Sequence, residues 1–268
     1  MPTFLPSSVG LARKSAVLGG QQVTWLEREG VDPPALLLHG WGASAASFVG
    51  LLRLAKTPRR LLAVDLPGFG ESPLGVTEWT RGGYAGLLRD WIHGRDWPAV
   101  AVLGHSYGGG VALRLADGPG APLDRLLLCA PSGLPEAPGR RSGRVRTFRA
   151  LRQSMETLLP ARVAEPAVEW LRQRMGSADY RAAGPLRPVL VRAVHEDLTE
   201  VARRLEMPTL IIWGGRDPEL PLDPYGKRLR QLIGSSELVE FPRSGHFPFL
   251  DEPQRFAAVF DSFVDAKL

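Results

Sequence analysis

One stretch near the middle of the chain constrains its fold more than any other. It reads AVAVLGHSYGGGVALRLA and covers residues 99–116. Its first five residues are apolar or small, which is typical of a buried parallel strand, whereas apolar residues recur at helical spacing in its second half. Between the two halves lies GHSYG, in which Ser106 has a glycine two positions before it and another two positions after it. The stretch therefore predicts a strand, a sharp turn at Ser106 and a helix.

This turn has the pattern of a nucleophile elbow. Gly104 and Gly108 allow the backbone to turn sharply enough to lift the Ser106 side chain out of the sheet. The same turn would place the Tyr107 backbone N–H at a helix N-terminus, where it can meet developing negative charge. A serine hydroxyl is a poor nucleophile at neutral pH, so the chain must also supply a base and a carboxylate that orients this base.

The rest of the chain alternates predicted strands with predicted helices. A β-hairpin is expected at residues 14–27, with Gly19 and Gly20 as its turn. Short buried strands are expected at residues 35–38, 61–64, 126–130, 209–213 and 238–241, and helices at residues 44–55, 79–95 and 253–264. Near-continuous apolar strands that alternate with helices predict a mostly parallel sheet covered on both faces. Functional residues should then gather beyond the carboxyl ends of the strands.

Two residues after such strands are candidates for the base and its carboxylate. His246 lies in SGHFPFLDEP and Asp217 lies in WGGRD, each just beyond a predicted strand. The chain order Ser106, Asp217, His246 is the order of the triad in enzymes with a nucleophile elbow. Asp65, in DLPG, also follows a strand, but we do not expect it to be the triad acid. His39 and His105 are interpreted as structural neighbours of the site rather than as catalytic groups.

Five landmarks in this order, HGWG, DLPGFGES, GHSYGG, WGGRD and SGHFPFLDEP, give the chain a clear family resemblance. From about Lys14 to Val264 the chain resembles the serine hydrolases of the α/β-hydrolase fold. The resemblance implies an α/β protein with a mostly parallel eight-stranded sheet, helices on both faces and an inserted helical cap. It also implies a carboxylic ester hydrolase. Haloalkane dehalogenases and epoxide hydrolases of this fold carry aspartate at the elbow, so the serine excludes both.

The oxyanion hole requires two backbone N–H groups directed at the substrate oxygen. By the same resemblance, Tyr107 and Trp41 supply them. Lipases of this fold often have HGGG where this chain has HGWG. The donor is a backbone group and survives this change, and the indole of Trp41 is expected to line the acyl pocket.

The segment at residues 131–207 interrupts the alternation of strands and helices with helical patterns. We therefore predict a core made of residues 1–130 and 208–268, and a helical cap over residues 131–207. The segment carries fourteen arginines and nine acidic residues, an excess equal to the net charge of +5 of the whole chain. Its run GRRSGRVRTFRALRQ contains Arg141, Arg144 and Arg149, the candidate substrate-binding residues. One interpretation is a solvated face, and the other is an acidic partner, such as a substrate carboxylate or an acidic carrier protein.

HGWG, DLPGFGES and an arginine-bearing cap together are similar to the pimeloyl-[acyl-carrier protein] methyl ester esterases. This closer resemblance implies an ester substrate, with acyl-carrier protein as a candidate partner. Two other hypotheses remain open. The first is a carbon–carbon bond hydrolase acting on ring-cleavage products with the same triad. The second is a ligand receptor on a hydrolase scaffold, in which the triad turns over slowly.

Composition and residue spacing exclude several other classes of protein. The single cysteine, Cys129, cannot form an internal disulfide and is interpreted as a core residue. No apolar run approaches the ~20 residues that span a bilayer, and the N-terminal segment does not have the pattern of a signal peptide, so a cytoplasmic protein is expected. No metal-ligand spacing or phosphate-binding loop is present, so we expect no metal and no cofactor. The arginine run lacks interleaved aromatic residues, which argues against a nucleic-acid partner.

Overall fold

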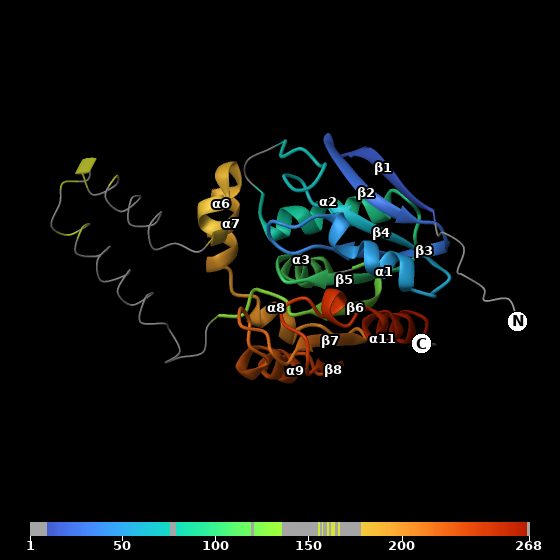
Figure 1. Cartoon of the computed structure of the whole chain (residues 1–268). Coiled ribbons are helices and arrows are strands. Elements are labelled where there is room, and N and C mark those ends of the chain that lie inside the picture. The colour runs from blue at the N-terminus through green and yellow to red at the C-terminus, as the bar shows by residue number, and fades with distance from the viewer. Residues whose placement is uncertain are drawn as a thin grey trace, which may run out of the picture.

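A single sheet of eight strands forms the centre of the protein in this computed structural model (Figure 1). The structure describes residues 10–75, 79–118, 121–135 and 178–266, together with six single residues between 155 and 166. The strands are β1 (Leu11–Leu18), β2 (Gln21–Arg28), β3 (Val31–Leu38), β4 (Arg59–Asp65), β5 (Val100–His105), β6 (Leu123–Cys129), β7 (Thr209–Gly214) and β8 (Ser236–Phe241). The number of strands agrees with the predicted α/β-hydrolase fold.

The order of strands across the sheet is β1-β2-β4-β3-β5-β6-β7-β8. In this order across the sheet, β4, β3, β5, β6, β7 and β8 each pair in parallel with the next strand. The strand β2 is antiparallel to both β1 and β4. The predicted hairpin of β1 and β2 is confirmed. Its two turn residues, Gly19 and Gly20, both have positive φ, of 53° and 83°, which glycine adopts without a Cβ clash. The sheet is therefore mostly parallel, with β2 as its reversed strand.

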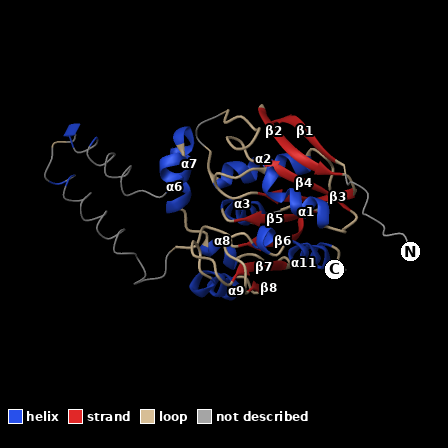
Figure 2. Ribbon diagram, in the orientation of Figure 1, coloured by secondary structure: helices blue, strands red, loops and turns tan. Residues whose placement is uncertain are grey.

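Helices cover both faces of this sheet (Figure 2). The α-helices of the described residues are α1 (Val49–Leu54), α2 (Arg81–His93), α3 (Tyr107–Ala116), α6 (Ala178–Ala182), α7 (Arg187–His195), α8 (Thr199–Arg203), α9 (Lys227–Leu232), α10 (Pro248–Asp251) and α11 (Pro253–Val264). Two 3₁₀-helices, η1 (Ala45–Phe48) and η2 (Gly184–Leu186), and one π-helical segment, η3 (Leu222–Gly226), are present as well. The predicted helix at residues 44–55 is divided into η1 and α1, whereas α11 has the predicted bounds. None of these helices is long and apolar enough to cross a membrane.

Two hydrophobic clusters lie on opposite faces of the sheet. Alternate residues of β3 show the division, because side chains alternate between the two faces of a strand. Leu36 and Leu38 belong to one cluster, together with residues of α2 and α3. Ala35 and Leu37 belong to the other, together with residues of α1 and α11. Because both faces are covered, the central strands are apolar at nearly every position, as the sequence indicated.

The carboxyl ends of β3 to β8 all meet at one edge of the sheet, because these six strands run in the same direction. The loops that follow β3, β5, β7 and β8 carry the segments HGWG, SYGG, RD and SGH. The segment between β6 and β7 is helical in its described part, with α6 and α7 standing beside the layered core in Figure 1. The bounds of 131–207 for a cap stay a prediction.

Candidate active site

Ser106 lies in a strained turn between β5 and α3. Its backbone has φ 50° and ψ −112°, a positive φ that residues other than glycine rarely adopt. The turn is held on both sides of the residue. Its N–H donates to the Cys129 carbonyl of β6 at 3.0 Å, and its carbonyl accepts from the N–H groups of Gly110 at 3.2 Å and Ser132 at 2.9 Å. These three hydrogen bonds fix the conformation that was predicted as a nucleophile elbow.

The two glycines of GHSYG are required by close backbone approach. A Cβ on Gly104 would lie 2.5 Å from the carbonyl oxygen of Gly108. A Cβ on Gly108 would lie 2.3 Å from the carbonyl oxygen of Leu38 and 2.5 Å from that of His39. Distances this short do not occur for real Cβ atoms, so α3 can pack against β3 and β5 at this point only without side chains.

His246 and Asp217 lie side by side, from loops that follow β8 and β7. The Nδ1–H of His246 donates to Asp217 Oδ2 at 2.6 Å, and both residues are buried. The other carboxylate oxygen of Asp217 accepts from the backbone N–H groups of Glu219 and Leu220, each at 2.9 Å. Because Nδ1 carries the proton in this hydrogen bond, Nε2 of the neutral ring is an acceptor. The carboxylate thus selects the tautomer that a general base needs.

The free edge of the His246 ring faces a second carboxylate. Its Nε2 lies 3.8 Å from Oε2 of Glu219, whose side chain is 61% exposed. The structure contains no hydrogen bond between the ring and the Ser106 hydroxyl. The sequence brought Ser106, Asp217 and His246 to one edge of the sheet, and the structure joins the last two directly. Glu219 was not among the predicted site residues, because an exposed glutamate two positions after an aspartate gives no signal of its own.

His105 supports the loop that carries His246. Its Nε2 donates to the His246 carbonyl at 2.9 Å, and its ring packs against the rings of His246 and Phe247, with centroids 4.8 and 4.9 Å away. Burial, followed by the neighbouring His246 ring, lowers the pKa of His105 to about 3. His105 therefore stays neutral at ordinary pH and has a supporting role, as predicted.

The backbone N–H groups of Trp41 and Tyr107 both lack an acceptor among the described residues. Tyr107 is the first residue of α3, and the first N–H of a helix has no partner within the helix. The two residues lie together, since their rings pack edge to face with centroids 5.3 Å apart. The Trp41 indole also meets Phe69 at 5.1 Å. Two free donors, one from the loop after β3 and one from the first residue of α3, are what an oxyanion hole requires.

His39 and Asp65 hold loops of the site. His39 is fully buried, accepts from the Leu66 N–H at Nε2 and contacts the Gly40 carbonyl through Nδ1. Burial lowers its pKa below the usual value. Asp65 accepts from the N–H groups of Ala45 at 2.6 Å and Glu71 at 3.0 Å. His39 therefore has the structural role that the sequence indicated, and Asp65 holds backbone N–H groups of two loops.

The candidate substrate-binding residues Arg141, Arg144 and Arg149 lie outside the described residues. Sequence reasoning also missed Arg81, a buried arginine at the start of α2 whose guanidinium donates to Ser132 Oγ beside the elbow. A charged residue at the beginning of a helix usually faces solvent, so the sequence carried no signal of this role. No group of three histidine, cysteine or acidic residues in the described ranges is placed to hold a metal ion.

Comparison with known proteins places the chain among the hydrolases of this fold. The sequence model of the alpha/beta hydrolase family matches residues 35–259. The chain is 29% identical over 258 residues to a pimeloyl-[acyl-carrier protein] methyl ester esterase of Aeromonas hydrophila, an alignment that covers 89% of this chain and 98% of the relative. It is 30% identical over 248 residues to an esterase of the same name from Neisseria meningitidis serogroup A, covering 87% and 77% of the two chains. The esterases among these relatives support the expectation of a carboxylic ester hydrolase.

Solved structures of low sequence identity have the same fold. An esterase from Exiguobacterium antarcticum superposes with a TM-score of 0.71 at 23% identity, covering 95% of this chain and all of the other. A meta-cleavage product hydrolase from Pseudomonas fluorescens superposes with a TM-score of 0.68 at 21% identity, covering 93% and 96%. At these identities the likeness establishes the architecture, and the chemistry must be argued from the residues.

Proposed function

Because this chain belongs to the alpha/beta hydrolase family, we propose that it cleaves carboxylic esters with Ser106 as nucleophile, His246 as general base and Asp217 as the carboxylate that orients the base. The observation that carries the proposal is the 2.6 Å hydrogen bond from His246 Nδ1 to Asp217 Oδ2. It directs the Nδ1 proton toward Asp217, so that in the neutral ring Nε2 is the acceptor, at the sheet edge where Ser106 lies. The two free N–H groups beside Ser106 support the same reading.

The first half of the reaction forms an acyl-enzyme. Ser106 Oγ attacks the ester carbonyl carbon while its proton passes to His246 Nε2. The carbonyl oxygen becomes an oxyanion, which accepts hydrogen bonds from the N–H groups of Trp41 and Tyr107. When the tetrahedral intermediate collapses, the bond to the alcohol oxygen breaks, and the proton on Nε2 passes to the departing alcohol. Asp217 stabilises the imidazolium that exists between these two transfers.

The second half removes the acyl group. His246 Nε2 takes a proton from a water molecule, whose oxygen attacks the acyl carbon. The same N–H groups hold the second oxyanion. Collapse breaks the bond to Ser106 Oγ, returns the proton to this oxygen and releases the carboxylic acid. The fixed Asp217 oxygen keeps the ring in one orientation through both halves.

The substrate class follows from the proposed cap over residues 131–207. Its excess of arginine, including Arg141, Arg144 and Arg149, is complementary to an acidic group on the acyl chain or on a carrier. The relatives named for pimeloyl-[acyl-carrier protein] methyl ester are consistent with such a substrate. We therefore place an ester with an acidic far end first among the candidate substrates, and acyl-carrier protein as the candidate carrier.

The test compares kcat/KM for a short-chain neutral methyl ester with that for its ω-carboxylate counterpart. Ser106→Ala serves as the blank for both, and its rate should fall by about 10⁴-fold or more, as for loss of other triad nucleophiles. A preference for the ω-carboxylate supports an acidic substrate, whereas a preference for the neutral ester leaves a general carboxylesterase. Undiminished ester hydrolysis by folded Ser106→Ala contradicts the mechanism. Selective turnover of a dienoate ring-cleavage product would instead identify a carbon–carbon bond hydrolase.

A further inference from the structure

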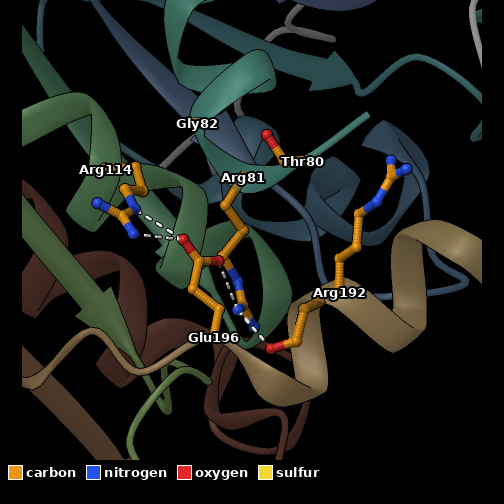
Figure 3. Close-up of a pocket in the computed structure, with 7 residues that line it drawn as sticks. Thr80, Arg81, Gly82, Arg114, Arg192 and Glu196 are labelled. Atoms are coloured by element: carbon orange, nitrogen blue, oxygen red, sulfur yellow. Dashed lines mark hydrogen bonds and ion pairs between the residues drawn. The ribbon is translucent and has the colours of Figure 1, made fainter. Parts of the chain in front are cut away.

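Arg81 is a buried charged side chain near the elbow with three hydrogen-bond acceptors. It is the first residue of α2, and its side chain is only 3% exposed. One terminal nitrogen donates to the Ala193 carbonyl at 2.7 Å and to Glu196 Oε2 at 3.0 Å, and the other donates to Ser132 Oγ at 2.9 Å. Figure 3 shows this guanidinium between α2 and the end of α7. A buried guanidinium with three acceptors is held in one orientation.

Ser132, which accepts from Arg81, is itself hydrogen-bonded to the elbow. The Ser132 N–H donates to the Ser106 carbonyl at 2.9 Å. This carbonyl and the Tyr107 N–H belong to the same planar peptide unit, so fixing the oxygen also fixes the direction of the N–H. The Arg81 guanidinium lies 5.2 Å from the centre of the Tyr107 ring as well. Arg81 thus contacts two residues that position this peptide unit. Ser132 holds its carbonyl oxygen, and Tyr107 carries the N–H that would serve as one donor of the oxyanion hole.

The opposite side of the guanidinium is attached to the last turn of α7. Glu196, just beyond α7, lies between two arginines of different helices in Figure 3. Its Oε1 accepts from Arg114 of α3 at 2.7 Å, while its Oε2 accepts from Arg81. The Ala193 carbonyl, which also accepts from Arg81, belongs to the last turn of α7. Arg81 therefore connects the end of α7 to Ser132, whose N–H holds the elbow peptide.

We propose that Arg81 is a positioning residue that aligns the Tyr107 N–H for the oxyanion and ties this alignment to the docking of α7. This inference rests on the proposed ester hydrolysis through Ser106. Arg81 itself touches no reacting atom. Its contribution is to hold the Ser132 hydroxyl and the Tyr107 ring in place, so that the donor is already oriented when the negative charge forms. Its loss should therefore reduce kcat with little effect on KM.

The surroundings of Arg81 permit a chemical rescue. A pocket of about 370 Å³ is lined by Thr80, Arg81, Gly82, Arg114, Arg192, Ala193 and Glu196 (Figure 3). A small cation can enter through this pocket and reach the position of the missing group. Ethylguanidinium replaces the atoms that Arg81→Ala removes, whereas ethylammonium offers the same charge without the planar array of donors.

The experiment measures kcat and KM for a neutral ester in Arg81→Ala, with Arg114→Ala as the matched control. Arg114 binds the same glutamate but has no contact with the elbow. We expect kcat of Arg81→Ala to fall by about tenfold to a hundredfold, short of the full loss of an oxyanion donor, with KM within about threefold. Ethylguanidinium should restore several-fold of kcat, and ethylammonium at equal ionic strength should not. Arg114→Ala should keep kcat within about threefold and show no response to ethylguanidinium.

Three results would overturn the inference: an unchanged kcat in Arg81→Ala, an absent rescue in the folded variant, or equal rescue by ethylammonium. If circular dichroism shows that Arg81→Ala is unfolded, Ser132→Ala takes its place. This variant removes the hydroxyl between Arg81 and the elbow, and an unchanged kcat in it also overturns the inference. Wild-type activity separates the two proposals, because ester hydrolysis lost in Ser106→Ala and kept in Arg81→Ala leaves the proposed function intact.

Discussion

Replacing Asp217 by asparagine should stop catalysis without disturbing the fold. One carboxylate oxygen accepts two backbone N–H groups, from Glu219 and Leu220, and the other accepts from His246 Nδ1. In the variant, the amide oxygen must keep the position facing the two N–H donors, because an NH₂ group there would face donors with a donor. The amide NH₂ is then forced toward His246 Nδ1. It donates to this nitrogen, so the ring proton moves to Nε2.

A ring with its proton on Nε2 cannot accept the proton of Ser106. Substitutions that impose this wrong tautomer in serine hydrolases cost about 10⁴-fold in kcat, which corresponds to about 5 kcal/mol of transition-state stabilisation. We expect a loss of this size in Asp217→Asn, measured as kcat on p-nitrophenyl acetate at pH 7 to 8. The melting temperature should stay close to that of the wild type, since both backbone hydrogen bonds remain.

Asp251→Asn is the matched control for this substitution. Its carboxylate accepts from the Gly245 N–H at 2.8 Å and so contacts the backbone of the same loop, but it does not contact the His246 ring. The amide oxygen can accept this hydrogen bond, so kcat should stay within about threefold of wild type. The reasoning is refuted if Asp217→Asn keeps more than about a tenth of wild-type kcat, or if both variants lose activity equally.

Three further predictions concern the scaffold of the site. Gly108→Ala places a Cβ 2.3 Å from the Leu38 carbonyl oxygen, so it should destabilise the fold by about 1–3 kcal/mol and lower kcat, which thermal melting and ester assays would detect. Asp65→Ala removes the acceptor of two backbone N–H groups, of which that of Ala45 is buried, and should lower stability by about 1–3 kcal/mol in urea titration, while the folded enzyme keeps most of its kcat; a loss of 10³-fold or more would make Asp65 catalytic. His105 has a pKa of about 3 in the fold against about 6.5 unfolded, so the unfolded chain alone takes up this proton as pH falls below 6.5. Acid should then remove up to about 1.4 kcal/mol per pH unit through this residue, and His105→Gln should lose stability less steeply between pH 6.5 and 4.5 than wild type.

The elements that the sequence predicted correctly are those whose signal is local. The turn at Ser106 follows from two glycines and a strand-to-helix change in periodicity, all within 18 residues. The pair Asp217 and His246 was found because each follows an apolar strand, and parallel strands bring their carboxyl ends to one edge. The hairpin at Gly19 and Gly20 and the helix α11 were equally legible from turn residues and helical spacing.

The features that the sequence did not reveal depend on contacts between distant segments. Arg81 and Glu196 are 115 positions apart, and each alone resembles an ordinary surface charge. Burial of Arg81 is set by the docking of α7 onto α2 and α3, which no local pattern encodes. Glu219 reaches His246 Nε2 only because the loops after β7 and β8 lie together. The helix α9 was also missed, because its six residues contain three cations and little apolar periodicity.

The central claim is that Ser106 is the nucleophile of an acyl-transfer reaction, and covalent labelling tests it most directly. The wild-type protein and Ser106→Ala would each be treated with a fluorophosphonate, followed by mass spectrometry of the intact chain and of its peptides. We predict one adduct per wild-type chain, located on the peptide that contains Ser106, and no adduct on the variant. An unlabelled wild-type protein, or an adduct that persists in Ser106→Ala, would contradict the claim.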